Sequence, residues 1–324
     1  MMKLKFINIS PALPLLFLLA GCGGEVQQAE SIPQADKMVS ESTNIYTLGN
    51  KVFIIPSPVQ TMQLFKKINV KFDKSLLNNT EKSASYKSKF EKGVNIGIFG
   101  GDLGFIVLNE QSQEAIAYLG IIKKLAEELG AAGIFDAVLM GNLEKSLGNQ
   151  SELLKVVTMA YQKCDGYFKE NNQADVGAMM IAGGWLESIH FTAFLAKTTK
   201  DPEILKSLGE QKQSLDNLLM LVSPYYSKKE APQYSAFVDD LTALQNEFKD
   251  VHIKYQYKES TIDAGKKTAV INSTSDIVIS DMTLERIVRM VEMIRTKIIE
   301  NKYQVGTPES GNTTTTAGAD TTKK

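Results

Sequence analysis

Residues 93–104, GVNIGIFGGDLG, decide how this chain folds. The stretch is almost wholly apolar, and its glycines recur at spacings of three and four, so they would form one stripe along a helix. Glycine costs about 1 kcal/mol per helix position relative to alanine, and packing has to offset that cost. A stripe without side chains lets another helix approach closely. The spacing matches neither of the common glycine-rich phosphate-binding patterns, so we do not expect a nucleotide site.

A second segment rich in small residues, 174–185, ends at Trp185, the single tryptophan of the chain. We expect the two small-residue segments to pack against each other or against another helix. Neither offers the roughly 20 apolar residues that cross a bilayer, because Asn95 and Asp102 interrupt the first one. The glycine-rich segments therefore predict a close helix–helix contact inside a globular domain.

The rest of the body also has helical periodicity, with capping residues or glycine at several ends. The expected helices cover 57–68, 94–108, 110–129, 135–147, 151–170, 174–197, 202–222, 232–257 and 283–303. Only 268–280 has the pattern of strands, and it predicts a hairpin around residues 272–276. The sequence thus predicts an all-α fold, a single multi-helix domain with one small β-hairpin near the C-terminus.

Polar residues on these apolar helices are the candidate site. Asn95 and Asp102 are seven residues apart and share one helix face. A buried carboxylate is costly unless it is paired, so Asp102 needs a partner or a solvated pocket. We expect a buried polar cluster of Asn95, Asp102, Glu187 and Lys212, with Lys212 as the partner of Asp102. The alternative is an open pocket into which Asp102 points.

The N-terminus has the layout of a signal peptide. Lys3 and Lys5 precede an apolar run that is too short to span a bilayer and ends at Leu19-Ala-Gly-Cys22. These four residues resemble the bacterial lipobox, which implies cleavage before Cys22 and its lipidation with several acyl chains, an effectively permanent anchor. The alternative is an ordinary secretory peptide with a chance cysteine.

Composition divides the chain into four parts. We expect a signal peptide over 1–21, a flexible tether over 22–50, a helical domain over 51–304 and a disordered threonine-rich tail over 305–324. The net charge of −1 argues against nucleic acid as a partner. With Cys22 lipidated, Cys164 has no partner for an intrachain disulfide.

Catalytic and metal chemistry have little support in the residues. Glu187 and His190 form one Glu-x-x-His pair, whereas a ferritin-like dimetal site uses two such pairs and two further glutamates. No Gly-x-Ser-x-Gly elbow marks a nucleophile. We therefore expect no metal, no cofactor and no catalytic residue.

The stretch from about residue 56 to 299 resembles an uncharacterised family of helical lipoproteins in the Bacteroidota. The resemblance rests on 95–103, NIGIFGGDL, which is similar to the family's NLGVYGADL segment, and on 182–187, AGGWLE. Asp102, Glu187 and Lys212 match the family pattern, which implies a shared polar cluster. The family has no assigned activity, so the resemblance bears on cellular location more than on chemistry.

These observations predict a cell-envelope lipoprotein. Lipoproteins of this phylum that reach the cell surface usually carry acidic residues directly after the cysteine, and here Glu25 is the single acid in residues 23–26. We expect an anchor in the outer membrane with the domain facing the periplasm. The expected function is a non-enzymatic ligand- or protein-binding module, and the alternative is an envelope hydrolase that uses Asp102 and Glu187 as paired acids.

Overall fold

The computed structural model describes residues 44–48, 51–55, 64–65, 68, 70–146, 149–226, 232–259, 261–263, 268–270 and 274–303. Cys22 and the C-terminal tail lie outside these residues, as does most of the helix expected over 57–68. No helix in the described ranges is long and apolar enough to pass through a bilayer.

The described body is built from helices, which confirms the all-α class with a small hairpin. The α-helices are α3 (Lys89–Leu108), α4 (Ser112–Glu128), α5 (Ala137–Ser146), α6 (Gln150–Glu170), α7 (Ala174–Thr199), α8 (Pro202–Val222), α9 (Pro232–Glu247) and α10 (Asp281–Ile299). Short 3-10 turns η1 (Lys74–Leu76) and η2 (Thr80–Ser85) precede α3, and η5 (Phe248–Asp250) follows α9. Most of these bounds lie within a few residues of those expected.

Helices α3 and α7 form the centre of the domain. A Cβ atom added to Gly97 would overlap the backbone carbonyl of Met180, and one added to Gly183 would overlap that of Val94. The two helices therefore touch backbone to backbone, which confirms that the two small-residue segments pack against each other. This contact explains the glycines, because no larger residue fits at the crossing.

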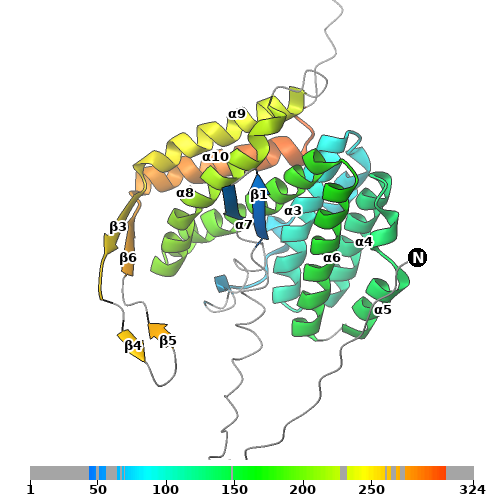
Figure 1. Cartoon of the computed structure of the whole chain (residues 1–324), viewed down its shortest axis with the longest axis horizontal. Helices are drawn as coiled ribbons and strands as arrows, with labels where there is room; N and C mark the ends of the chain where they lie inside the picture. Colours follow the sequence, from blue (N-terminus) through cyan, green and yellow to red (C-terminus); the bar gives the residue numbers. More distant parts are fainter. Residues whose placement is uncertain are drawn as a thin grey trace, which may run out of the picture.

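The remaining helices cover the two sides of the α3–α7 pair. In Figure 1, α4, α5 and α6 lie on one side, while α8, α9 and α10 lie on the other. The large aromatic side chains are buried between these layers, with Phe105 stacked on Phe191 across the central pair. Both central helices are consequently buried along nearly their whole length.

Local signals explain where the helices start. The Ser88 side chain accepts a hydrogen bond from the backbone of Glu91, and the Glu91 carboxylate accepts one from the backbone of Ser88, so a capping box begins α3 five residues earlier than expected. Asp201 caps α8, and Pro202 is its first residue, which is the start expected from the sequence. Gly130, with φ of +90°, follows the end of α4.

The strands differ in pairing from the expected hairpin. Strand β3 (His252–Gln256) pairs antiparallel with β6 (Thr274–Val278), and β4 (Thr261–Asp263) pairs with β5 (Thr268–Val270). Residues 268–270 and 274–278 thus belong to two successive ladders of one arm, which extends away from the helices (Figure 1). The Ile277 side chain lies against the bare backbone of Gly209, so β6 packs on α8 in this register.

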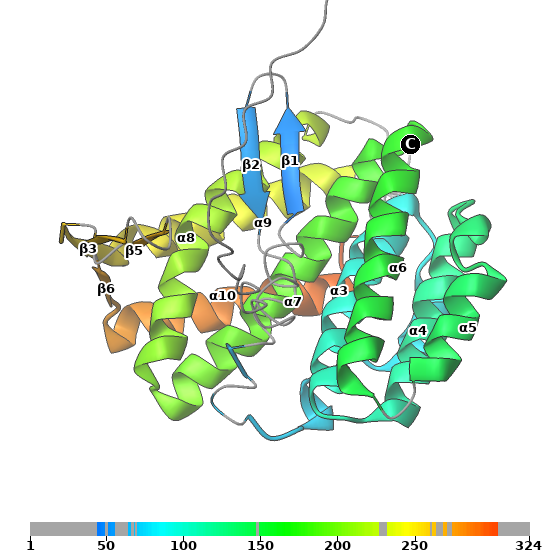
Figure 2. The same cartoon turned by 60° about the horizontal axis from the view of Figure 1, so that its bottom comes forward.

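One further expectation was wrong. The helix expected over 232–257 ends at Glu247, and β3 begins at His252, because cross-strand pairing with β6 replaces the last helical turns. Strand β1 (Asn44–Leu48) lies within the expected tether and pairs with β2 (Lys51–Ile55) as a hairpin that stands out clearly in Figure 2.

Candidate functional site

The candidate site begins at a close contact between α3 and α7. A Cβ atom on Gly101 would lie 2.7 Å from Cβ of Glu187, so the missing side chain of Gly101 leaves the room that Glu187 occupies. Asp102 is the next residue of α3, and both carboxylates are completely buried. The glycine stripe therefore brings two acids together in the middle of the domain.

Arg295 of α10 neutralises one of these acids. Its Nε donates to Oε2 of Glu187 and its Nη2 donates to Oε1, both over 2.7 Å. This two-pronged geometry uses both oxygens of the Glu187 carboxylate and is characteristic of arginine. Glu187 and Arg295 thus form a buried ion pair, which is costly to break from one side.

Asp102 has no such counter-charge of its own. Oδ2 of Asp102 accepts a hydrogen bond from the backbone N–H of Asn78 over 3.2 Å. Burial, and after it the negative charge of Glu187, raises the pKa of the Asp102 carboxyl well above its ordinary value, and a hydrogen bond to Glu187 acts in the same direction. The neutral acid is the form that this environment favours, because an ionised Asp102 would leave an uncompensated negative charge beside Glu187.

The cluster also holds the segment 73–86, which we call the strap. The backbone carbonyl of Leu76 accepts from Nη2 of Arg295 over 3.0 Å. The carbonyl of Asn78 accepts from the hydroxyl of Tyr118 over 2.7 Å, and the Asn78 side-chain amide donates to Tyr86. The strap contains only short 3-10 turns, so regular secondary structure does not pair the backbone groups of Leu76 and Asn78. The buried side chains form hydrogen bonds to them instead.

Two expected members of the cluster lie elsewhere. Lys212 does not pair with Asp102, because its Nζ donates to the carbonyl of Val251 over 2.9 Å at the junction that follows α9. Backbone carbonyls near the C-terminal end of a helix that lack a hydrogen-bond partner attract a cation, which explains why Lys212 binds the Val251 carbonyl. Asn95 is fully buried, but its amide donates to the carbonyl of Glu91 within α3.

His190 lies one turn beyond Glu187 on α7. Its ring is hydrogen-bonded to the carbonyl of Leu76, and burial, followed by the charge of Arg295, lowers its pKa to about 4. His190 is therefore a neutral group that helps to hold the strap. Because Arg295 uses both oxygens of Glu187, that acid is committed to another contact, while Nε2 of His190 is buried without a hydrogen-bond partner among the described residues. In the described ranges no three histidine, cysteine or acidic side chains are grouped so as to hold a metal ion.

Arg295 is the residue that sequence reasoning missed. The chain has three arginines among 36 basic residues, and they lie together on α10. Arginine offers a planar, bidentate partner that lysine cannot, so a rare arginine on an otherwise apolar helix face was the available signal. Arg286, on the same helix, pairs with Glu247 and Asp250 near the end of α9.

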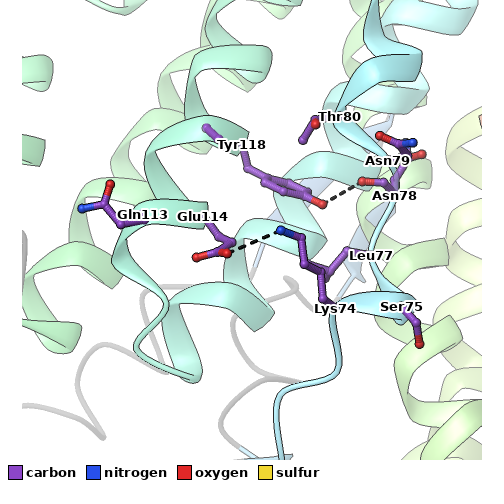
Figure 3. Close-up of a pocket in the computed structure, with 10 residues that line it drawn as sticks. Lys74, Ser75, Leu77, Asn78, Asn79, Thr80, Gln113, Glu114 and Tyr118 are labelled. Atoms are coloured by element: carbon purple, nitrogen blue, oxygen red, sulfur yellow. Dashed lines mark hydrogen bonds and ion pairs between the residues drawn. The ribbon is translucent and has the colours of Figure 1, made fainter.

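A pocket of about 490 Å³ lies on the outer side of the strap, between it and α4 (Figure 3). Lys74 and Glu114 face each other across it, with 3.5 Å between Nζ and Oε1. The Tyr118 ring lines the pocket while its hydroxyl bonds to Asn78. The lining residues are Lys74, Ser75, Leu77, Asn78, Asn79, Thr80, Gln113, Glu114, Ala117 and Tyr118. The strap thus separates a buried charged cluster from a polar pocket.

Comparison with known proteins gave no further identification: no family model, curated protein or solved structure matches the chain.

Proposed function

We propose that this protein is a lipid-anchored cell-envelope protein whose helical domain binds a small polar molecule in the pocket between the strap and α4, with no chemistry of its own. The lipobox that ends at Cys22 supports the anchor. For an anchor in the outer membrane, the single acid within residues 23–26 supports a domain that faces the periplasm rather than the cell exterior. The resemblance to Bacteroidota lipoproteins supports the same location.

The main support for the proposal is that the acids Asp102 and Glu187 are buried, whereas the pocket between the strap and α4 is open. Asp102 and Glu187 are both fully buried, and Arg295 uses both oxygens of Glu187. Paired acids that hydrolyse a glycosidic bond have to reach the substrate and leave room for it. The pocket beside the strap, by contrast, has the size of small-molecule sites and mixes polar with apolar lining.

Filling the pocket tests the binding function. Ala117 is an exposed residue that lines the pocket, so Ala117→Trp should occupy the space without disturbing the core. Ile116→Trp is the matched control, since Ile116 is exposed on the same helix and does not line the pocket. Native mass spectrometry of the protein extracted from its own membrane should show a bound small molecule in the wild type and in Ile116→Trp, but not in Ala117→Trp.

A mass equal to the lipidated chain alone in all three proteins would contradict the binding function. A bound mass that persists in Ala117→Trp would place the ligand elsewhere.

Labelling with a fatty-acid analogue tests the anchor. The wild type should incorporate the label and remain in the membrane fraction, whereas Cys22→Ser should do neither. Equal labelling of both proteins would contradict lipidation at Cys22 and would leave the binding function to be judged by the mass measurement.

A further inference from the structure

The pocket presents one positive and one negative side chain from opposite walls. Lys74 comes from the strap and Glu114 from α4, and their charged atoms point toward each other (Figure 3). No second charged side chain lines the pocket on either wall, so its lining is neutral overall. Apolar surface of Leu77, Ala117 and the Tyr118 ring completes the lining.

From this arrangement we infer that the ligand is a zwitterion with an ammonium and a carboxylate close together, namely a free α-amino acid. The inference rests on the proposed function and specifies its ligand class. The ammonium of the amino acid would bind Glu114, and its carboxylate would bind Lys74. Its side chain would lie against the apolar part of the pocket.

The existing ion pair is easy to replace. The Lys74 side chain is 70% exposed, and the 3.5 Å separation from Glu114 is long for a charge-assisted hydrogen bond. An exposed pair of this kind is worth little to the fold. A ligand that carries both charges replaces one weak pair with two contacts, each with a full opposite charge.

Ligands of other classes fit the pocket less well. A simple cation would compete with Lys74 for Glu114 and leave Lys74 without a partner. A simple anion would do the same to Glu114. An uncharged sugar would hydrogen-bond to Lys74 and Glu114 without bringing an opposite charge to either, so it would not replace the Coulomb attraction of the ion pair. The opposed charges thus favour a ligand that is itself neutral overall but charged at two points.

Calorimetric titration of the purified full chain in detergent tests the ligand class. The probes are a panel of amino acids that includes L-alanine, L-glutamine and L-phenylalanine. Ethylamine and propionate, which each keep one charge of alanine, and glucose are the comparisons. We expect at least one amino acid to bind and the three comparison compounds to bind at least tenfold more weakly.

Two single variants and one control locate the binding. Glu114→Gln and Lys74→Ala should each lower the affinity for the amino acid by about tenfold or more, because each removes a contact between full charges. Lys124→Ala is the control, since Lys124 is an exposed lysine of α4 that does not line the pocket. Its affinity should equal that of the wild type.

Specific outcomes overturn the inference. Tighter binding of an amine in Lys74→Ala would identify a cation site, and retained binding in Glu114→Gln would identify an anion site. Binding of glucose without any amino acid would reject the zwitterion while leaving the binding function intact. If none of the probes binds, the ligand class is wrong, and the proposed function is then decided by the native mass of the extracted protein.

Discussion

Two ion pairs lie on opposite sides of the strap, and they differ in exposure to solvent and in the distance between their charged atoms. Glu187 and Arg295, on the inner side, are 0% and 10% exposed and form two hydrogen bonds of 2.7 Å. Lys74 and Glu114, on the outer side, are 70% and 29% exposed and lie 3.5 Å apart. The inner pair is held by its surroundings, whereas the outer pair can separate.

The difference teaches how one segment can serve both structure and binding. In the inner cluster of Asp102, Glu187 and Arg295, Asp102 accepts a hydrogen bond from the backbone N–H of Asn78. Arg295 donates one to the backbone carbonyl of Leu76. The outer face of the same strap contributes Lys74 and Ser75 to the pocket. We therefore expect changes at the inner pair to affect folding and changes at the outer pair to affect only binding, and the following variants test that division.

Loss of the inner arginine should have the largest effect. Arg295→Ala leaves Glu187 buried without a counter-charge and removes a donor from the Leu76 carbonyl, so we expect the free energy of unfolding to fall by about 3 to 5 kcal/mol. Arg289→Ala is the control, because Arg289 is exposed on the same helix. Urea denaturation followed by circular dichroism measures both, and equal stability of the two variants would mean that the inner pair does not support the fold.

Adding one methyl group beside Glu187 should have the next largest effect. In Gly101→Ala the new Cβ would meet Cβ of Glu187 at 2.7 Å, and relieving that overlap should cost about 1 to 3 kcal/mol. Gly166→Ala in α6 meets nothing within 4 Å, so it should instead stabilise the protein by up to about 1 kcal/mol. Thermal unfolding of the two variants should therefore shift in opposite directions, and a shift in the same direction would argue against the close packing of α3 on α7.

The protonation of Asp102 can be tested by its pH dependence. A carboxyl whose pKa is raised on folding binds its proton more tightly in the folded state, so its contribution to stability is greatest below the unfolded pKa and is lost as the pH rises toward the folded pKa. Asp102→Asn keeps the shape and removes this titration. Relative to the wild type, the variant should gain stability as the pH rises above about 4, by at most about 1.4 kcal/mol per pH unit.

Denaturation curves of both proteins between pH 4 and 8 measure this difference. If it did not change with pH, Asp102 would have the same pKa in the folded and unfolded states. If the wild type gained stability over Asp102→Asn with rising pH, Asp102 would be an ionised partner of the inner cluster.

The sequence predicted those parts of the fold that depend on local pattern. The spacing of glycines in α3 and the small residues of α7 indicated the central contact, because both are properties of a single helix. The Asp201-Pro202 start of α8 is equally local. The pairing of β3 with β6 is not, because the two strands are joined through the β4–β5 ladder and Ile277 of β6 packs against Gly209 of another element, α8.

The candidate site shows the same limit. Burial of Asp102 followed from its apolar surroundings, and its neighbour Glu187 lies on the helix expected to pack beside it. The partner of Glu187 could not be found in this way, because Arg295 is 108 residues away in sequence and on another helix. Lys212 was chosen as the cation because it lies in a segment of core-facing pattern, yet its long side chain reaches the Val251 carbonyl instead.

The outer pair should show the smallest effect on stability. Lys74→Ala removes one partner of an exposed ion pair, and such pairs contribute about 0 to 1 kcal/mol, reduced further by salt. The inner bonds to Leu76 and Asn78 involve neither Lys74 nor Glu114, so the strap should stay in place. The urea midpoint of Lys74→Ala should therefore lie close to that of the wild type and closer still in 0.5 M NaCl. If Lys74→Ala destabilised the protein as much as Arg295→Ala, both pairs would be structural, and the pocket could not release its own lysine to a ligand without unfolding the strap.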